Sequence, residues 1–247
     1  MKYIFANWKM YLSFDESCIL MSQLLQEKSE MQNVEVAIFP SSISFSEIEK
    51  LARGSQWSLG AQNVAWVEKG AYTGAVSAQL FSELGAKYAL VGHSERRHIF
   101  HEKNEDTQKK MSACFEAGLI PVLCIGETQE DLEAGKRQYR LQRQIDEALM
   151  GNNISERSFF IAYEPVWAIG SGSACTASDA EDIIGWIKLH LKDALGVDNV
   201  PVLYGGSVDA TNVVSYTAQA SIDGVLVGGC SAKFDEFSSI LKAFDGA

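Results

Sequence analysis

The sequence predicts an α/β protein with a (β/α)₈ barrel, in which eight parallel strands are ringed by helices. Eight short apolar runs alternate with eight longer amphipathic stretches along the 247 residues. Most of the apolar runs are continuous rather than alternating, as in parallel strands that are covered on both faces. Glycine stands where four helices should end, at Gly85, Gly118, Gly151 and Gly196.

Each element follows from these patterns. We expect strands at residues 2–6, 34–39, 57–61, 88–91, 120–125, 159–163, 202–204 and 224–227. We expect helices at residues 13–30, 45–52, 78–84, 104–117, 138–149, 178–195, 211–219 and 234–244. The first helix opens with Ser13, a residue typical of helix caps, and carries Ile19, Leu20, Leu24 and Leu25 on one face.

Strict alternation of strand and helix indicates right-handed parallel connections, which can close into a barrel or form an open doubly wound sheet. No G-x-G-x-x-G follows the first strand, so the dinucleotide-binding open sheet loses support. No linker, charge block or low-complexity tract divides the chain. We therefore favour the barrel, and we expect residues 1–247 to form a single catalytic domain.

The net charge of −11 argues against a nucleic-acid partner and against attraction to anionic membrane surfaces. An anionic substrate would then need local positive potential from backbone N–H groups, helix N-termini and a lysine. Any site proposed for such a substrate must meet this demand.

The five cysteines are scattered and form no C-x-x-C pair, which predicts reduced thiols in a reducing compartment. His98 and His101 lie close together, but no cysteine is near them, so we expect no metal site. The apolar run after Lys2 is too short for a signal peptide, and no stretch is long enough for a membrane span. These features predict a cytoplasmic protein.

In a barrel of this kind, catalytic groups lie at the carboxyl ends of strands. Lys9 follows the first strand and could hold an anion, or it could be a solvated lysine that starts a loop. His93 follows the fourth strand and could transfer protons or polarise a substrate, or it could be a structural hydrogen-bonding residue. Glu164 follows the sixth strand at the edge of an apolar core, where desolvation makes a carboxylate a stronger base; a capping or ion-pairing role is the alternative.

The segment after Glu164 suits a lid that excludes water from the site, although a plain exposed loop is the alternative. Small and glycine residues follow a proline that stiffens one end. The segment comprises Pro165, Val166, Trp167, Ala168, Ile169, Gly170, Ser171, Gly172, Ser173, Ala174 and Cys175.

Glycine pairs follow the seventh and eighth strands, at Gly205–Gly206 before Ser207 and at Gly228–Gly229. Glycine leaves backbone N–H groups accessible, and these two loops form the phosphate site common in this fold. Either pair alone could serve a plain turn. Their occurrence at both positions predicts a phosphate site.

Seven motifs in this order resemble the triosephosphate isomerase family, over nearly the whole chain. They are Asn7-Trp8-Lys9, Gly60-Ala61-Gln62-Asn63, Gly92-His93-Ser94-Glu95-Arg96-Arg97, Cys124-Ile125-Gly126-Glu127, Ala162-Tyr163-Glu164-Pro165-Val166-Trp167-Ala168-Ile169-Gly170, Tyr204-Gly205-Gly206-Ser207 and Gly224-Val225-Leu226-Val227-Gly228-Gly229.

The resemblance implies a TIM barrel that interconverts dihydroxyacetone phosphate and D-glyceraldehyde 3-phosphate, in glycolysis and gluconeogenesis, without a cofactor. By resemblance, Glu164 is the base and His93 is the neutral electrophile. Lys9 stabilises the enediolate and the phosphate, Asn7 positions Lys9, and Glu95 is a further acidic residue of the site.

The phosphate would be held by backbone N–H groups of four residues, which the resemblance identifies as Gly170, Ser207, Gly228 and Gly229. The family also implies a homodimer in which the loop of residues 62–77 enters the neighbouring subunit and Thr73 supports the neighbour's site.

Three positions depart from the family pattern. Ser173-Ala174-Cys175 replaces the Lys-Thr-Ala that usually ends the lid. Ala75 replaces a glutamate that pairs with an arginine across the dimer in relatives, so we expect a less polar contact near Arg96. Cys230 replaces a small alanine.

Two other interpretations compete with the isomerase. A Schiff-base aldolase would use Lys9 as a nucleophile and would need a desolvated lysine. A binding or scaffold protein on the same fold would have a broken catalytic set, and every candidate catalytic position is intact.

Overall fold

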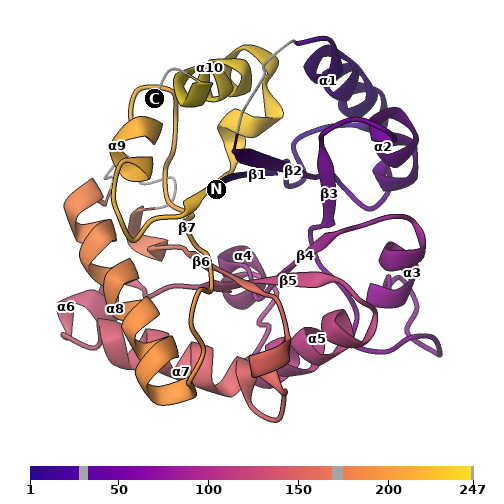
Figure 1. The fold of residues 1–247 in the computed structure, drawn as a ribbon. Coiled ribbons are helices and arrows are strands. Elements are labelled where there is room, and N and C mark those ends of the chain that lie inside the picture. Colours follow the sequence, from indigo (N-terminus) through magenta and orange to yellow (C-terminus); the bar gives the residue numbers. More distant parts are fainter. Residues whose placement is uncertain (28–32, 169–174, 246–247) are drawn as a thin grey trace.

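The computed structural model describes residues 1–27, 33–168 and 175–245. Its eight strands form one closed barrel in the order β1 to β8, and each strand is parallel to both of its neighbours (Figure 1). The helices surround this ring on the outside. The predicted (β/α)₈ barrel is therefore confirmed.

All eight strands lie within one residue of their predicted limits. They are β1 (Lys2–Asn7), β2 (Val34–Phe39), β3 (Ser58–Ala61), β4 (Tyr88–Val91), β5 (Ile120–Ile125), β6 (Phe160–Tyr163), β7 (Val202–Tyr204) and β8 (Gly224–Val227).

The helices of the described residues include all eight that were predicted, and two short ones that were not. They are α1 (Phe14–Gln26), α2 (Phe45–Ala52), α3 (Ala78–Glu83), α4 (Ser94–His98), α5 (Asn104–Glu116), α6 (Gln129–Glu133), α7 (Arg137–Leu149), α8 (Ala177–Leu195), α9 (Val213–Thr217) and α10 (Phe234–Asp245). Three 3₁₀ turns are η1 (Ile154–Glu156), η2 (Val166–Ala168) and η3 (Gly229–Ala232). The last predicted residues of the first helix, 28–30, lie outside the described residues.

Local capping explains several helix boundaries. Ser13 and Glu16 form a reciprocal capping box at the start of α1, as the sequence predicts. The side chain of Thr176 accepts a hydrogen bond from the Asp179 N–H and caps α8. That helix ends at Gly196, whose φ of 67° lies in the left-handed region that glycine adopts without strain.

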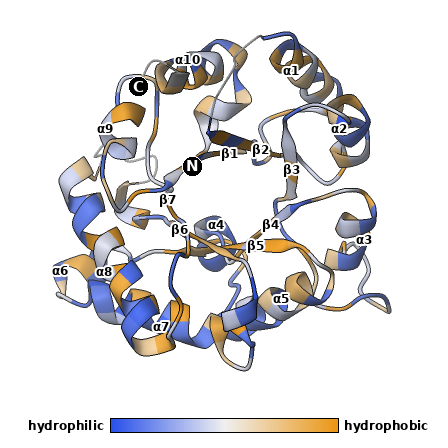
Figure 2. Cartoon of the chain, viewed as in Figure 1, coloured by the Kyte–Doolittle hydropathy of each residue, from blue (hydrophilic) through white to orange (hydrophobic). Residues whose placement is uncertain are grey.

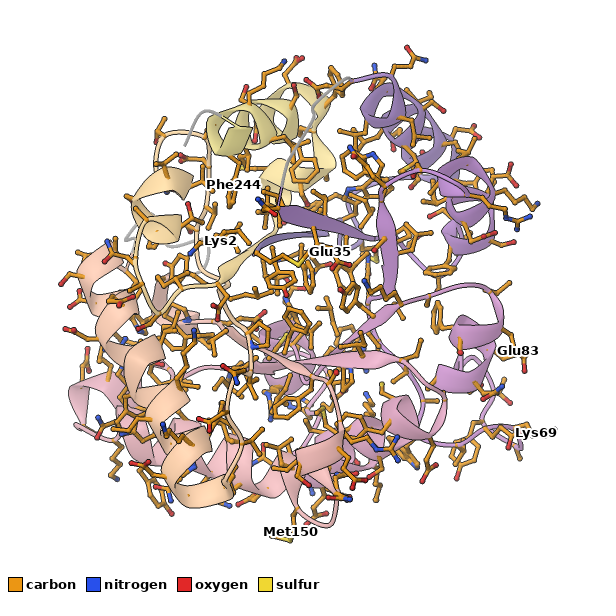
Figure 3. The ribbon with its side chains drawn as sticks, in the orientation of Figure 1. Lys2, Glu35, Lys69, Glu83, Met150 and Phe244 are labelled. Atoms are coloured by element: carbon orange, nitrogen blue, oxygen red, sulfur yellow. The ribbon has the colours of Figure 1, made fainter. Side chains whose placement is uncertain are left out.

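The strands separate two hydrophobic cores. Alternate residues along each strand face opposite sides, so Phe5 points into the barrel while Ile4 and Ala6 face the helices. Side chains fill the ring of strands (Figure 3), and Phe5 contacts the rings of Tyr88 and Phe160 inside it. The strands consist largely of hydrophobic residues, whereas each surrounding helix contains both hydrophobic and hydrophilic residues (Figure 2). The interior of the barrel is therefore a packed core, and a site is expected at the carboxyl ends of its strands.

The amino ends of the strands carry a polar cluster centred on Glu35, which lies near the middle of the ring in Figure 3. Its carboxylate accepts hydrogen bonds from the Tyr88 hydroxyl at 2.7 Å, from the Ser58 hydroxyl at 3.0 Å, and from the Lys87 ammonium. Lys2, at the start of β1, donates to the Ile222 carbonyl at 2.6 Å. Glu35 thus connects side chains of β3 and β4 and of the residue before β4 at this end of the barrel.

Two further predictions concern the whole chain. All five cysteines are free thiols, as expected. Within the described ranges, no helix is both long enough and apolar enough to cross a membrane.

Candidate active site

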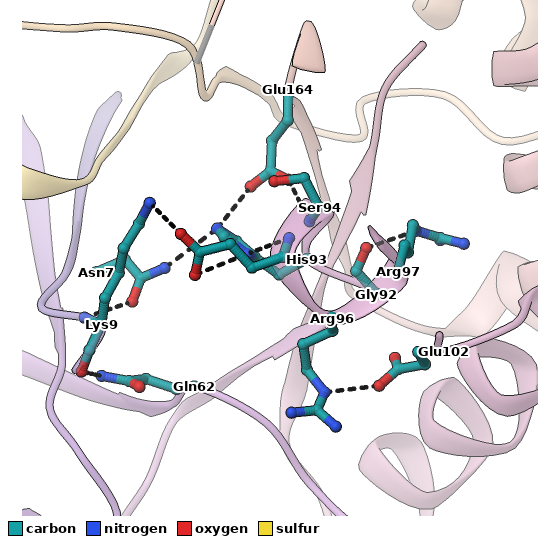
Figure 4. Close-up of polar contacts among 11 residues, drawn as sticks. Asn7, Lys9, Gln62, Gly92, His93, Ser94, Arg96, Arg97, Glu102 and Glu164 are labelled. Atoms are coloured by element: carbon teal, nitrogen blue, oxygen red, sulfur yellow. Dashed lines mark hydrogen bonds and ion pairs between the residues drawn. The ribbon is translucent and has the colours of Figure 1, made fainter. Parts of the chain in front are cut away.

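The carboxyl ends of β1, β4 and β6 bring together the residues predicted for the site. Asn7 ends β1, His93 comes two residues after β4, and Glu164 directly follows β6 (Figure 4). Lys9 and Glu95 join them from the loop after β1 and from helix α4. Residues more than 150 positions apart in the sequence thus share one edge of the barrel, because parallel strands all end at the same face.

The Glu164 carboxylate is buried, with 2% of the residue exposed. Its Oε2 accepts a hydrogen bond from the backbone N–H of Ser94 at 2.8 Å, and its Oε1 lies 3.2 Å from Nε2 of His93. The Glu164 N–H donates to the Ile125 carbonyl of β5 at 2.7 Å. Both the side chain and the main chain of Glu164 are therefore held by neighbouring elements.

His93 caps the amino end of α4, where its Nδ1 accepts a hydrogen bond from the Glu95 N–H at 3.2 Å. A nitrogen that accepts a hydrogen bond carries no proton, so this contact fits a neutral imidazole whose proton is on Nε2. That Nε2 lies beside Glu164 and 3.4 Å from the Asn7 amide nitrogen. The arrangement directs one N–H of the ring into the site.

Lys9 has a left-handed backbone, with a φ of 49° that is costly for a residue other than glycine. Two amides hold this conformation: Asn7 Oδ1 accepts from the Lys9 N–H at 3.0 Å, and Gln62 Nε2 donates to the Lys9 carbonyl at 2.8 Å. The ammonium pairs with Glu95 at 2.7 Å. The strained turn places a cation at the mouth of the barrel.

A cavity of about 330 Å³ opens between these residues and the loops after β7 and β8. Its lining includes Asn7, Lys9, His93, Glu164, Ser207, Gly228 and Gly229. A Cβ on Gly228 would approach the Lys9 side chain to 3.3 Å, and a Cβ on Gly205 would approach Cγ of Glu164 to 2.9 Å. The glycines thus let the backbone of these loops pass close to both charged side chains.

The cavity lining includes residues that were not predicted as site residues, among them Tyr11 and Asp209. Tyr11 lies beside Gly229, and Asp209 lies in the loop after β7. Hydrogen bonding from Thr211 lowers the pKa of Asp209, so this residue adds a negative charge at the rim. The sequence contained no pattern that marked either of them.

Cys230 also lines this cavity, at the position where the family usually has alanine. Burial raises the pKa of its thiol to about 11, so the group is uncharged at neutral pH. The substitution therefore adds bulk but no negative charge beside the glycine loop.

The predicted lid is described only at its two ends. Pro165 and the 3₁₀ turn η2 begin it, and the Trp167 indole N–H donates to Glu127 at 2.8 Å. Ser207 donates to the Ala168 carbonyl at 3.0 Å, and the Tyr216 hydroxyl donates to the Cys175 carbonyl at 2.5 Å. Ile169, Gly170, Ser171, Gly172, Ser173 and Ala174 lie outside the described residues, so the lid and the Gly170 phosphate contact stay predictions.

Several residues that hold the site together were not predicted from the sequence. Gln62 follows β3, so the strand-end rule that found Glu164 could have found it as well. Ser94 contributes only a backbone N–H, which no side-chain pattern reveals. Arg97 fixes the loop before His93 by donating to the Gly92 carbonyl at 2.6 Å.

The loop of residues 62–77 begins at Gln62 beside Lys9 and carries Thr73, which is exposed. Backbone hydrogen bonds join its ends, from Ala65 N–H to the Val76 carbonyl at 2.8 Å, and Lys69 marks its outer edge in Figure 3. Trp66 and Tyr72 on this loop are 38% and 49% exposed. The aromatic residues of the loop are therefore unusually accessible to water.

Arg96, the arginine near Ala75, has partners within its own chain. Its Nε donates to Glu102 at 2.7 Å, and the Phe100 ring lies 4.9 Å from its guanidinium carbon. Lys110 also binds the same Glu102 carboxylate.

Comparison with known proteins gives one consistent family. A family model described as triosephosphate isomerase matches residues 2–244. The chain is 43% identical to a triosephosphate isomerase of Dehalococcoides mccartyi over 97% of its own length and 94% of the relative. It is 40% identical to one from a Synechococcus species, over 97% and 93% of the two chains. It is 37% identical to one from Dictyoglomus thermophilum, over 98% and 99%.

Proposed function

The chain belongs to the triosephosphate isomerase family, and on this basis we propose that it interconverts dihydroxyacetone phosphate and D-glyceraldehyde 3-phosphate in glycolysis and gluconeogenesis. The observation that carries the proposal is the convergence of Glu164, His93 and Lys9 on one cavity beside the glycine loops. The cavity is lined by a candidate base, a candidate electrophile, a cation and glycine loops whose N–H groups could bind phosphate. These groups together suit proton transfer on a small phosphorylated carbonyl compound.

Glu164 is proposed as the base. It removes a proton from the carbon next to the substrate carbonyl and returns it to the neighbouring carbon, so no net oxidation or reduction occurs. Its burial and the hydrogen bond from the Ser94 N–H support this role, because both restrict where the carboxylate can point.

His93 is proposed to polarise the carbonyl through its Nε2–H, and Lys9 to stabilise the negative charge of the enediolate and phosphate. The capping contact on Nδ1 supports a neutral histidine, which is also the protonation state known for this family's electrophile and implied here by membership of it. Asn7 positions Lys9 by accepting from its N–H. Glu95 pairs with the Lys9 ammonium and is the further acidic residue of the site.

Backbone N–H groups of Ser207, Gly228 and Gly229 are proposed to bind the substrate phosphate, together with Gly170. A protein with a net charge of −11 needs such local donors for an anionic substrate. The neutral Cys230 thiol is compatible with this role.

We further propose that the protein is a cytoplasmic homodimer with one catalytic domain per chain. The exposed Trp66, Tyr72 and Phe100 support an interface around the loop of residues 62–77, because a monomer would leave these rings in water. A monomer-sized scattering mass at micromolar concentration, together with full activity, would refute the dimer.

An aldolase with Lys9 as its nucleophile is less well supported. The Lys9 nitrogen forms an ion pair with Glu95 at 2.7 Å. An ammonium in an ion pair has no free electron pair with which to attack a carbonyl carbon.

The test is a coupled assay of the purified protein with D-glyceraldehyde 3-phosphate, in which formation of dihydroxyacetone phosphate is followed. We expect kcat/KM toward the diffusional range of about 10⁸ M⁻¹s⁻¹. Glu164→Gln keeps the shape of the side chain but removes the base, and should lower kcat by at least ~10²–10⁴. Absence of turnover from folded wild-type protein would overturn the isomerase, and unchanged turnover in Glu164→Gln would overturn the mechanism.

A further inference from the structure

We propose that Gln144 is a positioning residue for the catalytic base and acts on Glu164 through the backbone of Gly126. This inference rests on the proposed role of Glu164. Gln144 does not line the cavity, and no feature of the sequence singles it out.

The first observation is a double hydrogen bond between Gln144 and one residue. Gln144 is on α7, outside the barrel, and is 6% exposed. Its Oε1 accepts from the Gly126 N–H at 2.8 Å, and its Nε2 donates to the Gly126 carbonyl at 3.1 Å. One amide therefore satisfies both backbone groups of Gly126.

The register of the barrel explains why Gly126 needs this partner. Strand β4 ends at Val91, which pairs with Leu123, so β5 extends past β4 at its carboxyl end. On the other side, the carbonyls of Ile125 and Glu127 accept from Glu164 and Val166 of the β6 segment. The groups of Gly126 lie beyond the end of β4, and buried backbone groups are costly without partners. The Gln144 amide takes the place of the strand that has ended.

The second observation is a direct contact between Gly126 and the base. A Cβ on Gly126 would lie 1.8 Å from the Glu164 carbonyl oxygen and 2.8 Å from the Glu164 carbonyl carbon. The two backbones therefore touch, with no space for a methyl group. Any shift of Gly126 toward β6 moves the main chain from which the Glu164 carboxylate extends.

The other proposed catalytic groups are held by different elements. Lys9 is fixed by Asn7 and Gln62, and His93 by helix α4. Loss of the Gln144 amide should therefore misplace the base while the phosphate loops and the cation stay in position. A misplacement of about 1 Å costs on the order of 10²-fold in rate.

The experiment compares three variants. Gln144→Leu keeps similar volume and removes both hydrogen bonds. Gln144→Glu keeps the shape and the oxygen that accepts from the Gly126 N–H, but its carboxylate has no hydrogen to donate to the Gly126 carbonyl. Gln142→Leu makes the same substitution at an exposed position of the same helix and is the matched control.

For Gln144→Leu we expect kcat to fall about 10- to 100-fold, while the inhibition constant of inorganic phosphate changes less than about twofold. Gln144→Glu should retain more activity than Gln144→Leu, and Gln142→Leu should match the wild type. If Gln144→Leu does not fold, Gln144→Glu provides the same comparison with a smaller expected loss. A wild-type kcat in a folded Gln144 variant, or a loss of phosphate affinity equal to the loss of kcat, would overturn the inference.

A double-mutant cycle tests whether Gln144 acts through the base. If it does, adding Gln144→Leu to Glu164→Gln should change the residual rate by less than about twofold, because the group being positioned is already absent. A further loss of about 10-fold or more would show a general structural effect and overturn the inference. The proposed function fails separately, when the wild type does not turn over or Glu164→Gln keeps wild-type activity.

Discussion

The two ends of the barrel hold their charged groups in different ways. At the amino ends of the strands, Glu35 is bound by Ser58, Tyr88 and Lys87, three residues from neighbouring strand segments. At the carboxyl ends, Lys9 and Glu164 face a cavity of about 330 Å³. The Lys9 ammonium pairs with Glu95, and the Glu164 carboxylate accepts from the Ser94 N–H and lies beside His93.

This difference suggests that the two ends of the barrel have different roles, one in stability and the other in the proposed chemistry. A carboxylate whose partners lie on neighbouring strands or directly before them adds to the stability of the barrel, because its charge is neutralised only when those strands are assembled. Glu164 instead lines a cavity that a substrate could occupy. The charged groups at the amino ends of the strands therefore contribute to stability, whereas those at the carboxyl ends face the candidate site.

Replacing Lys9 by Met should give the largest effect and would sharpen the contrast. The variant keeps the length of the side chain and the strained backbone, but it removes the charge from the cavity. We expect kcat/KM to fall by at least ~10²-fold, the usual effect of removing one electrostatic donor, with little change in thermal stability. Steady-state kinetics and a melting curve measure the two parts. A large loss of stability with retained activity would mean that Lys9, like Glu35, contributes to stability, and would contradict the difference between the two ends.

Replacing Glu35 by Gln should give the reverse pattern. The neutral amide loses charge-assisted hydrogen bonds, so we expect the free energy of unfolding to fall by about 1–3 kcal/mol while kcat and KM stay within about twofold. Urea denaturation and the coupled assay test this together. A change in kcat of about tenfold would contradict the separation of the two ends.

The same variant gives a pH test. Burial raises the pKa of Glu35, but hydrogen bonds from Lys87, Tyr88 and Ser58 outweigh it and hold the pKa below its ordinary value. A lowered pKa in the folded state means that this stabilisation is present above the unfolded value of about 4.3 and is lost as the pH falls through the folded value. The stability difference between wild type and Glu35→Gln should therefore be constant near pH 7 and shrink below about pH 4. A difference that grows in acid would contradict this sign.

The smallest effect is expected at an exposed ion pair between α8 and the segment that follows it. Lys192 lies 3.8 Å from Asp198, and their side chains are 62% and 61% exposed. Lys192→Gln should change the free energy of unfolding by less than about 0.5 kcal/mol, because such pairs are solvated and screened. If Lys192→Gln lowered the free energy of unfolding as much as Glu35→Gln, the effect of Glu35 could not be attributed to its partners on neighbouring strands.

The sequence predicts the barrel well because each strand is marked by composition. The apolar run at residues 120–125, and the run at 34–39 that only Glu35 interrupts, identify β5 and β2 to the residue. Helices α4 and α6 were missed because five residues are too few to show a 3.6-residue period. The predicted helix at 211–219 was too long, since α9 covers only Val213–Thr217.

The candidate site is predictable only in part. Glu164, His93 and Lys9 were found because strand ends are known positions for chemistry. Asn7, which holds Lys9, was also predicted, but Gln144 and Gln62 were not: their amides bind backbone groups far away in the sequence. Gln62 directly follows a strand and could have been found by that rule, but Gln144 lies within a helix, where no periodicity or motif marks its contact with Gly126.

The pairing of β1 with β8 has a consequence for how the protein is made. Tyr3 pairs with Gly224, so the second edge of β1 can be covered only after β8 has been synthesised. At a synthesis rate of about 5–20 residues per second, this takes on the order of 10 s or more. Until then one edge of β1 has no partner strand, and an unpaired strand edge can associate with other chains. Closure of the barrel therefore depends on its last strand, which pairs with residues near the start of the first.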